Sequence, residues 1–148
     1  MAGVTPNARN HAGLGPKDSR FVAVDELPWE QSRFPGIETK TLFIDQATGS
    51  VTALIRMAPG ARLPDHEHPL SEQSYVIDGV LVDDDGSCAA GDFVWRPAGS
   101  RHEAWAGPQG GTFLAMFQIP NKFFGRDGRE TDFLGNDWAK SWSHALGK

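Results

Sequence analysis

The sequence contains little cysteine, no long apolar run and no basic tract. Cys88 is the one cysteine in 148 residues, which excludes an internal disulfide and any Cys-X-X-Cys zinc or redox site. No segment approaches the roughly 20 apolar residues that a membrane-spanning helix needs. Residues 1–20 also lack the basic start and the apolar core of a signal peptide. We therefore expect a cytoplasmic protein that has no membrane partner.

Positive charge is scarce and scattered along the chain. The sequence has 14 lysines and arginines against 19 aspartates and glutamates, for a formal net charge of −5. A groove that follows the phosphates of a nucleic acid needs clustered positive charge. We therefore expect no nucleic-acid partner, and a small neutral or metal-chelating ligand fits this composition better.

Glycine and proline, by contrast, are plentiful and evenly spread. The 17 glycines and 10 prolines separate short runs rich in Val, Ile, Phe, Thr and Trp, which is typical of many β-strands joined by tight turns. An all-β barrel or sandwich is therefore predicted. A single domain is expected at this length, and we assign it residues 20–148. Residues 1–19 are polar and without period, so a flexible N-terminal arm is predicted there.

Only the end of the chain has a helical pattern. Asn136 is a good N-cap, and apolar side chains recur at helical spacing from Trp138 through Trp142 to Leu146. This pattern predicts a short amphipathic helix over about residues 136–146, with its tryptophans packed on the barrel.

Three of the five histidines lie in two short segments framed by glycine and proline. His66 and His68 are two residues apart, so on a strand their side chains point to the same face. Glu72 has the same parity if the strand resumes after Pro69, and His102 could reach the same point from a facing strand. We predict that His66, His68, Glu72 and His102 bind one metal ion. Two alternatives stay open: the imidazoles could be hydrogen-bonded core residues, and Glu72 could orient an imidazole without ligating.

Such a ligand set suits a divalent ion but does not select one. Three neutral imidazoles and a carboxylate leave two positions open in an octahedral site, whereas structural zinc closes tetrahedrally. We favour Fe(II), because the resemblance described below implies a function that uses it. Zn, Mn, Ni and Cu stay open as alternative metals. Arg56, Gln73 and Arg96 are candidates to donate hydrogen bonds to an oxygen of a small-molecule substrate.

The two histidine segments resemble the paired motifs of the cupin superfamily. Every anchoring position matches, except that Ala106 stands where the second motif usually has asparagine, a position outside the ligand set. The resemblance implies a double-stranded β-helix, a jelly-roll barrel, in which the same four residues hold the metal. The matching positions are Gly60, His66, His68, Glu72 and Gly79 in the first motif and Gly91, Pro97, Gly99 and His102 in the second.

Two finer resemblances point to different functions. Residues 83–102 resemble the zinc-binding cupin domain of the ChrR anti-sigma factors, which implies a metal- or ligand-binding sensor without turnover. Residues 117–128 are similar to small cupin dioxygenases that cleave acetylacetone and 2,4'-dihydroxyacetophenone. That likeness implies a non-haem Fe(II) enzyme that uses O2 to cleave a C–C bond in a diketone or hydroxyketone chelated to the metal. A metal-dependent isomerase, lyase or decarboxylase is a third possibility. A homodimer is expected by analogy with barrels that pair through exposed strand edges.

Overall fold

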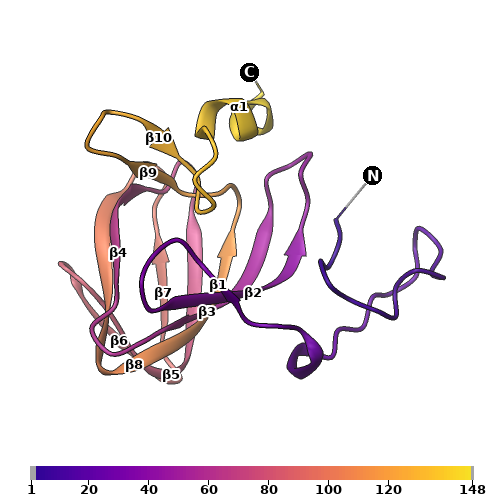
Figure 1. Ribbon diagram of the computed structural model, residues 1–148, viewed down its shortest axis with the longest axis horizontal. Helices are drawn as coiled ribbons and strands as arrows, with labels where there is room; N and C mark the ends of the chain where they lie inside the picture. Colours follow the sequence, from indigo (N-terminus) through magenta and orange to yellow (C-terminus); the bar gives the residue numbers. More distant parts are fainter. Residues whose placement is uncertain (1–2, 148) are drawn as a thin grey trace.

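The computed structural model describes residues 3–147, and most of its ordered elements are β-strands (Figure 1). One short helix, α1 (Trp138–Trp142), lies near the C-terminus and continues as a 3-10 turn, η2 (Ser143–Leu146). The predicted all-β cupin barrel with a short C-terminal helix is confirmed. The strands are β1 (Glu30–Gln31), β2 (Ile37–Ile44), β3 (Val51–Met57), β4 (Arg62–Glu67), β5 (Glu72–Asp83), β6 (Gly86–Ala89), β7 (Phe93–Arg96), β8 (Arg101–Phe117), β9 (Lys122–Phe124) and β10 (Glu130–Thr131).

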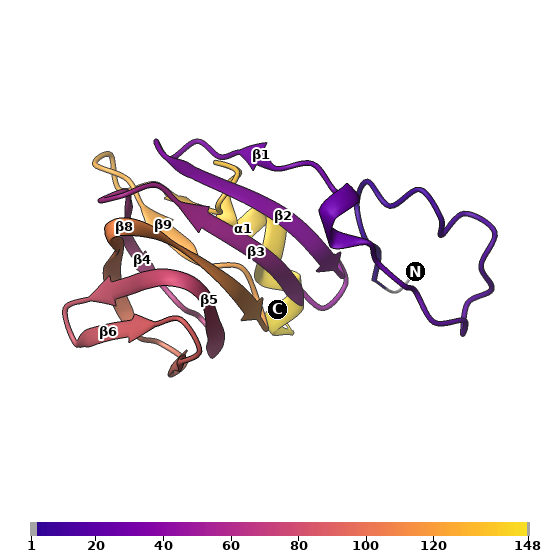
Figure 2. The same cartoon turned by 90° about the horizontal axis from the view of Figure 1, so that it is seen from below.

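Two long strands, β5 and β8, curl the sheet into a barrel. The first part of β8 pairs with β4 and its last part pairs with β3, while β5 runs antiparallel beside both parts. The two ends of β5 pair in addition with β7 and with β6. Figure 2 shows the result, with β2 and β3 on one side and β5 and β6 on the other. Because β5 and β8 run through both sides of the curled sheet, they bring residues of strands that are far apart in sequence to face the same interior.

Gly79 and Gly110 allow β5 and β8 to cross closely where the sheet bends. Both have positive φ, at 68° and 82°, a region that glycine enters without steric cost. A Cβ atom at Gly79 would lie 2.1 Å from the carbonyl oxygen of Gly110. Gly79, the last glycine of the first motif, is therefore required, because a side chain there would collide with the backbone of β8.

Every second side chain along the strands points into the barrel and fills its interior. On β3, for example, Ala53, Ile55 and Met57 are buried, while the residues between them are partly exposed. The single thiol, Cys88, is 6% exposed and belongs to the same core. The main core cluster thus lies between the two halves of the curled sheet.

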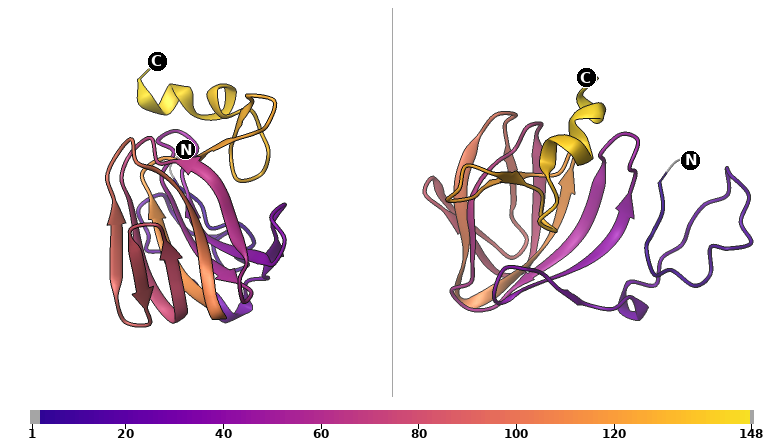
Figure 3. Two further views of the ribbon diagram at one scale, coloured as in Figure 1. Left: turned by 90° about the vertical axis from the view of Figure 1, so that its left-hand side faces the viewer. Right: turned by 45° about the horizontal axis from the view of Figure 1, so that its top comes forward.

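The C-terminal helix covers one end of the barrel (Figure 3). Its N-cap lies one residue later than predicted, because Asp137, and not Asn136, accepts a hydrogen bond from the Lys140 backbone N–H at 3.0 Å. The indole of Trp138 donates to the Pro120 carbonyl at 2.8 Å, and the indole of Trp142 donates to Asp132 Oδ2 at 3.0 Å. Both tryptophans are buried, so the predicted packing on the barrel is confirmed.

The N-terminal segment leaves the barrel and returns to its edge (Figure 1). Val4 forms an isolated β-bridge with Ile44, and the Thr5 hydroxyl donates to the Leu42 carbonyl at 2.7 Å. A 3-10 turn, η1 (Val24–Glu26), precedes the first strand. The flexibility proposed for residues 1–19 stays a prediction, and residues 1–2 lie outside the described part of the chain. Over residues 3–147, no helix has the length and apolar character needed to cross a membrane.

Candidate metal centre

Three histidines meet inside the barrel. His66 lies on β4 directly opposite His102 on β8, and His68 follows the end of β4. One ring nitrogen from each histidine lies within 4.8 Å of the others. The side chains of His66 and His68 are almost completely buried, at 2% and 1% exposure. The structure thus brings together the three imidazoles that strand parity and motif spacing predicted.

Two of the three rings are held in one tautomer by acceptors behind them. His66 Nδ1 lies 2.7 Å from the Pro64 carbonyl oxygen, and His102 Nδ1 lies 3.1 Å from Asp83 Oδ2. A carbonyl and an ionised carboxylate can only accept, so His66 Nδ1 carries the proton and donates. His102 Nδ1 lies between an acceptor and a donor, because Arg96 Nε–H also points at it from 3.3 Å. The shorter contact, to the ionised Asp83 carboxylate, favours the proton on this nitrogen as well. The Nε2 atoms then keep their lone pairs, which is the arrangement that a metal-binding imidazole needs.

The spacing of the free nitrogens fits a divalent ion. Metal ions such as zinc bind imidazole nitrogen at about 2.0–2.1 Å, so two ligands at right angles are about 2.9 Å apart and two at the tetrahedral angle about 3.3 Å apart. His68 Nε2 and His102 Nε2 lie 2.9 Å apart. This distance matches neighbouring ligands at right angles on one ion, and it is also the length of a hydrogen bond between the two imidazoles.

Glu72 lies beside the histidines but is not part of the group of three nitrogens. It is the first residue of β5 and is 5% exposed. Its Oε2 atom lies 3.2 Å from His68 Nδ1, the ring nitrogen on the other side from Nε2, in a contact too misaligned for a hydrogen bond. Its Oε1 atom accepts from the Ser74 hydroxyl at 2.9 Å, and Asn121 Nδ2 donates to Oε2 at 3.4 Å. Within the described residues, the group suited to hold a metal contains the histidines without Glu72.

The charge states of these groups suit metal binding. Burial, and then the neighbouring His68, lower the pKa of His66 to about 4. Burial, and then Arg96, also lower the pKa of His102. Burial alone would raise the pKa of Glu72, but the nearby His68 and Arg96 reverse this and bring it to about 2. At neutral pH, His66 and His102 are therefore neutral and the carboxylate is ionised.

Arg96 is the predicted substrate contact that lies at the cluster. Its side chain is buried on β7, with Nη2 2.8 Å from Asp83 Oδ2 and Nη1 3.7 Å from Glu72 Oε1. The guanidinium therefore joins the two carboxylates that stand behind His102 and His68.

Arg56 and Gln73 are not brought to the cluster. Arg56 lies on the outer face of β3, where it forms a 2.9 Å ion pair with Glu38 and covers the ring of Trp29. Gln73 is exposed on β5. Both follow or precede a buried residue by one position, so strand alternation directs their side chains away from the interior.

Asp83 and Asn121 are site residues that the sequence did not reveal. Asp83 is the last residue of β5, and its Oδ1 accepts from the N–H groups of Asp85 and Gly86 in the turn that follows. Its Oδ2 atom, however, binds Arg96 and His102. The β5–β8 pairing has bulges near Gly79, which change the inward parity of β5 from even to odd numbers. No periodicity rule applied to the sequence could have anticipated that change.

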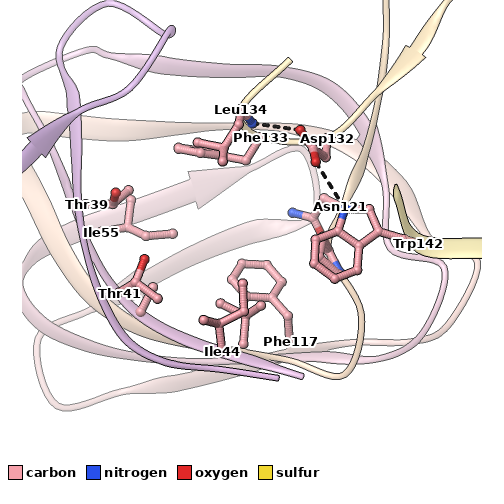
Figure 4. A pocket seen from close by; sticks show the side chains of 13 residues that line it. Thr39, Thr41, Ile44, Ile55, Phe117, Asn121, Asp132, Phe133, Leu134 and Trp142 are labelled. Atoms are coloured by element: carbon pink, nitrogen blue, oxygen red, sulfur yellow. Dashed lines mark hydrogen bonds between the residues drawn. The ribbon is translucent and has the colours of Figure 1, made fainter. Parts of the chain in front are cut away.

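Two spaces adjoin the cluster, and a third lies beside the first of them. The cavity beside the rings is about 20 Å³, enough for one water or ion. A mainly apolar pocket of about 140 Å³ opens at the barrel end near α1 (Figure 4). A polar cleft of about 510 Å³ lies on the other side, where Asp83, Arg96 and His102 form part of its wall.

Comparisons with solved structures agree with the fold. A candidate acetylacetone dioxygenase from Methylibium petroleiphilum is 22% identical, with a TM-score of 0.71 over 90% of this chain and 96% of that chain. An acetylacetone dioxygenase from Acinetobacter johnsonii is 18% identical, with a TM-score of 0.67 over 90% and 94%. The anti-sigma factor ChrR of Rhodobacter sphaeroides, solved with SigE, is 21% identical, with a TM-score of 0.55 over 64% and 51%. At these identities the likeness establishes the fold.

The sequence itself also has a family match. No curated protein matches it. Residues 17–122, however, match the profile of the ChrR cupin-like domain, and this segment contains all three clustered histidines as well as Glu72. Since it spans well over half of the chain, the protein belongs to the ChrR cupin-like domain family.

Proposed function

We propose that this protein is a metal-dependent cupin enzyme, a non-haem Fe(II) dioxygenase that cleaves a C–C bond in a small diketone or hydroxyketone. One observation carries the proposal: three imidazoles converge, and acceptors behind His66 and His102 leave their Nε2 atoms free. The fold likeness to acetylacetone dioxygenases, over nine-tenths of the chain, supports the choice of substrate class.

In this proposal His66, His68 and His102 are the metal ligands. Glu72 has the second of the two roles expected for it, in which the carboxylate orients an imidazole. Its Oε2 atom lies 3.2 Å from His68 Nδ1, so its negative charge favours the tautomer of His68 that carries the proton on Nδ1 and leaves Nε2 for the metal. Its negative charge also offsets part of the charge of a divalent ion.

The remaining residues hold this arrangement and keep it dry. When bound, Fe(II) would supply Lewis acidity toward two chelating oxygens of the ketone and a meeting point with O2. Phe113, Phe117 and Phe123 line the cavity beside the histidines and limit the entry of water. Arg96 is already engaged by Glu72 and Asp83, so its role is to hold these carboxylates in place.

A sensor without turnover is the second candidate, because the family match is to the ChrR cupin-like domain. Such a protein would bind zinc or a small ligand and change its contact with a partner. The same three histidines would hold the ion in both cases. The two functions differ in whether O2 is consumed.

Metal content and O2 uptake separate the candidates. The protein is purified without oxygen, loaded with Fe(II) or Zn(II), analysed for bound metal, and mixed with a panel of diketones and hydroxyketones in an oxygen electrode cell. The dioxygenase proposal expects equal consumption of O2 and ketone by the Fe(II) form only. Tight zinc binding with no O2 uptake in any form would favour the sensor. Ketone conversion without O2 would instead indicate a Lewis-acid isomerase, lyase or decarboxylase. Light scattering tests the expected homodimer in the same samples.

A further inference from the structure

The outer side of the sheet formed by β3, β8, β5 and β7 carries a group of exposed apolar side chains. Strand alternation sends every second residue of these strands into the core and the residues between them outward. Four of the outward residues are large and about half exposed: Tyr75 at 45%, Ile77 at 51%, Phe93 at 50% and Trp95 at 60%. We call this surface the apolar face and define it by Leu54, Tyr75, Ile77, Phe93, Trp95 and Leu114.

The strand register lines these side chains up across four strands. Phe93 of β7 lies directly opposite Tyr75 of β5, and Tyr75 lies opposite Leu114 of β8. Leu114 in turn lies opposite Leu54 of β3. Residues that are directly opposite each other in a sheet point to the same side and touch. The apolar face is therefore one continuous surface and not a set of scattered residues.

Aromatic rings elsewhere on the surface are covered by cations of the same chain. The guanidinium of Arg62 lies 4.6 Å from the ring centre of Trp105, and that of Arg101 lies 3.8 Å from the ring centre of Phe124. Among residues 3–147, no lysine or arginine covers a ring of the apolar face in this way. In Figure 1 the N-terminal segment lies beyond β2, and α1 lies at the end of the barrel. The rings of the apolar face therefore stay in contact with water in the single chain.

The area of the apolar face matches what a dimer interface needs. An aromatic residue offers about 150–250 Å² of surface, so three of them at half exposure offer about 300 Å². Ile77, which is also half exposed, and the partly exposed leucines bring the total to roughly 500 Å². A standard protein interface buries about 800 Å² on each partner, and about three-fifths of this area, again about 500 Å², is apolar.

A second copy of this chain suits the face better than a lipid surface does. Two sheets pack face to face with their strands aligned within about 30°, and a two-fold axis brings the same surface to both sides of the interface. Two identical copies would repel each other if the shared surface were charged. The outward residues of β7 and of the adjoining part of β8 are uncharged: Phe93, Trp95, Thr112, Leu114 and Met116. An anionic membrane attracts lysine and arginine, which these positions lack, and the net charge of the chain is −5.

We propose that two copies of this chain associate through the apolar face, in a two-fold symmetric dimer in which their β3–β8–β5–β7 sheets pack against each other. The homodimer expected from the sequence was placed at strand edges by analogy, whereas this interface is a sheet face. Phe93 and Trp95 also line the polar cleft that has Arg96 and His102 in its wall. The second copy therefore stands beside the mouth of that cleft.

Sedimentation of the Zn(II)-loaded full chain tests the interface. At about 50 μM the native protein should sediment as a dimer and dissociate on dilution. Phe93→Glu puts a carboxylate on both sides of the interface and should weaken the dimer about tenfold or more. Phe21→Glu makes the same chemical change at another exposed phenylalanine, outside the apolar face, and should leave the dimer unchanged.

A second variant and a second measurement guard against loss of folding. Gln73 is exposed on β5 and lies opposite Trp95, so Gln73→Lys adds a charge to the apolar face without removing an apolar side chain. It should also weaken the dimer. Both Gln73 and Phe93 point away from the histidines, so both variants should keep the zinc content of the native protein. A dimer lost while zinc is retained then reports on the interface and not on the fold.

Several outcomes would overturn the proposal. A native chain that stays monomeric at this concentration would do so, and so would a dimer that persists in both variants. Monomers that float with vesicles of phosphatidylcholine and phosphatidylserine would assign the face to a lipid surface instead. The interface does not depend on the proposed reaction: a dimer without O2 uptake supports the interface and refutes the dioxygenase, and a monomer with O2 uptake does the reverse.

Discussion

Replacing Asp83 by asparagine tests whether this carboxylate holds His102 in the metal-binding tautomer. Asp83 Oδ1 accepts from the turn N–H groups of Asp85 and Gly86, and Oδ2 accepts from Arg96 and His102. An asparagine amide has one acceptor oxygen. If that oxygen faces the turn, the NH2 group faces two donors. His102 must then accept through Nδ1 and carry its proton on Nε2, where the lone pair for the metal is lost.

The structure sets the size of the effect. Removing a partner behind a ligating histidine typically lowers metal affinity about 10- to 100-fold. The Asp83 and Arg96 side chains are only 10% and 8% exposed, so solvent screens their 2.8 Å ion pair little. Hydrogen bonds to charged groups contribute about 1.5–3 kcal/mol each. We therefore expect Asp83→Asn to weaken zinc binding by this factor and to lower the unfolding free energy by about 2–3 kcal/mol.

Two measurements and one control make the test decisive. Zinc affinity is obtained by competition with a chromogenic chelator at pH 7, and stability by urea unfolding of the metal-free protein. Asp84→Asn makes the same chemical change one residue later, at an exposed position of the same turn, and should alter neither quantity. If Asp83→Asn and Asp84→Asn behave alike in both assays, the tautomer argument is wrong.

Three further predictions follow from the same geometry. His66→Ala and His102→Ala should each lose bound metal while the circular dichroism spectrum keeps its β-signature; stoichiometric metal in both variants would refute the ligand assignment. Gly79→Ala should lower the unfolding free energy by about 3 kcal/mol or more, since its new Cβ would meet the Gly110 carbonyl at 2.1 Å. Gly86→Ala, with no atom within 4 Å of its new Cβ, should cost much less in the same urea titration. In the metal-free protein, a folded pKa of about 4 for His66 against about 6.5 unfolded means that the unfolded state binds more protons below pH 6.5. Stability should therefore fall by about 2 kcal/mol between pH 7 and pH 5 from this group. It should fall further as Glu72 titrates between about 4.5 and about 2. A His66→Ala variant with the same decrease between pH 7 and pH 5 would contradict the first step.

Short-range features made much of the fold predictable. Glycine and proline mark the turns, and alternation marks the strands between them. The helix at the C-terminus follows from the spacing of Trp138 and Trp142, although its cap is Asp137, one residue beyond the predicted Asn136. Capping depends on backbone geometry that sequence rules locate only within a residue or two.

The residues around the histidines are brought there by pairing between strands that are distant in sequence. Arg56, Gln73 and Arg96 were equal candidates, and only the register of β3, β5 and β7 separates the buried Arg96 from the two outward residues. Asn121 is distant in sequence from Glu72, which it contacts. Contacts of this kind follow from how the sheet curls.

The amino-acid sequence by itself determined the barrel and its three histidines. His66 and His68 have one residue between them, so on a strand they share a face, and the spacing of the second motif supplies His102. The tertiary structure decided which carboxylates stand behind those rings and what space lies beside them. A bulge reverses the inward parity of β5 before Asp83, and the pocket exists only where the C-terminal segment closes over strands far from it in sequence. Both are consequences of long-range packing, which local patterns of residues do not encode.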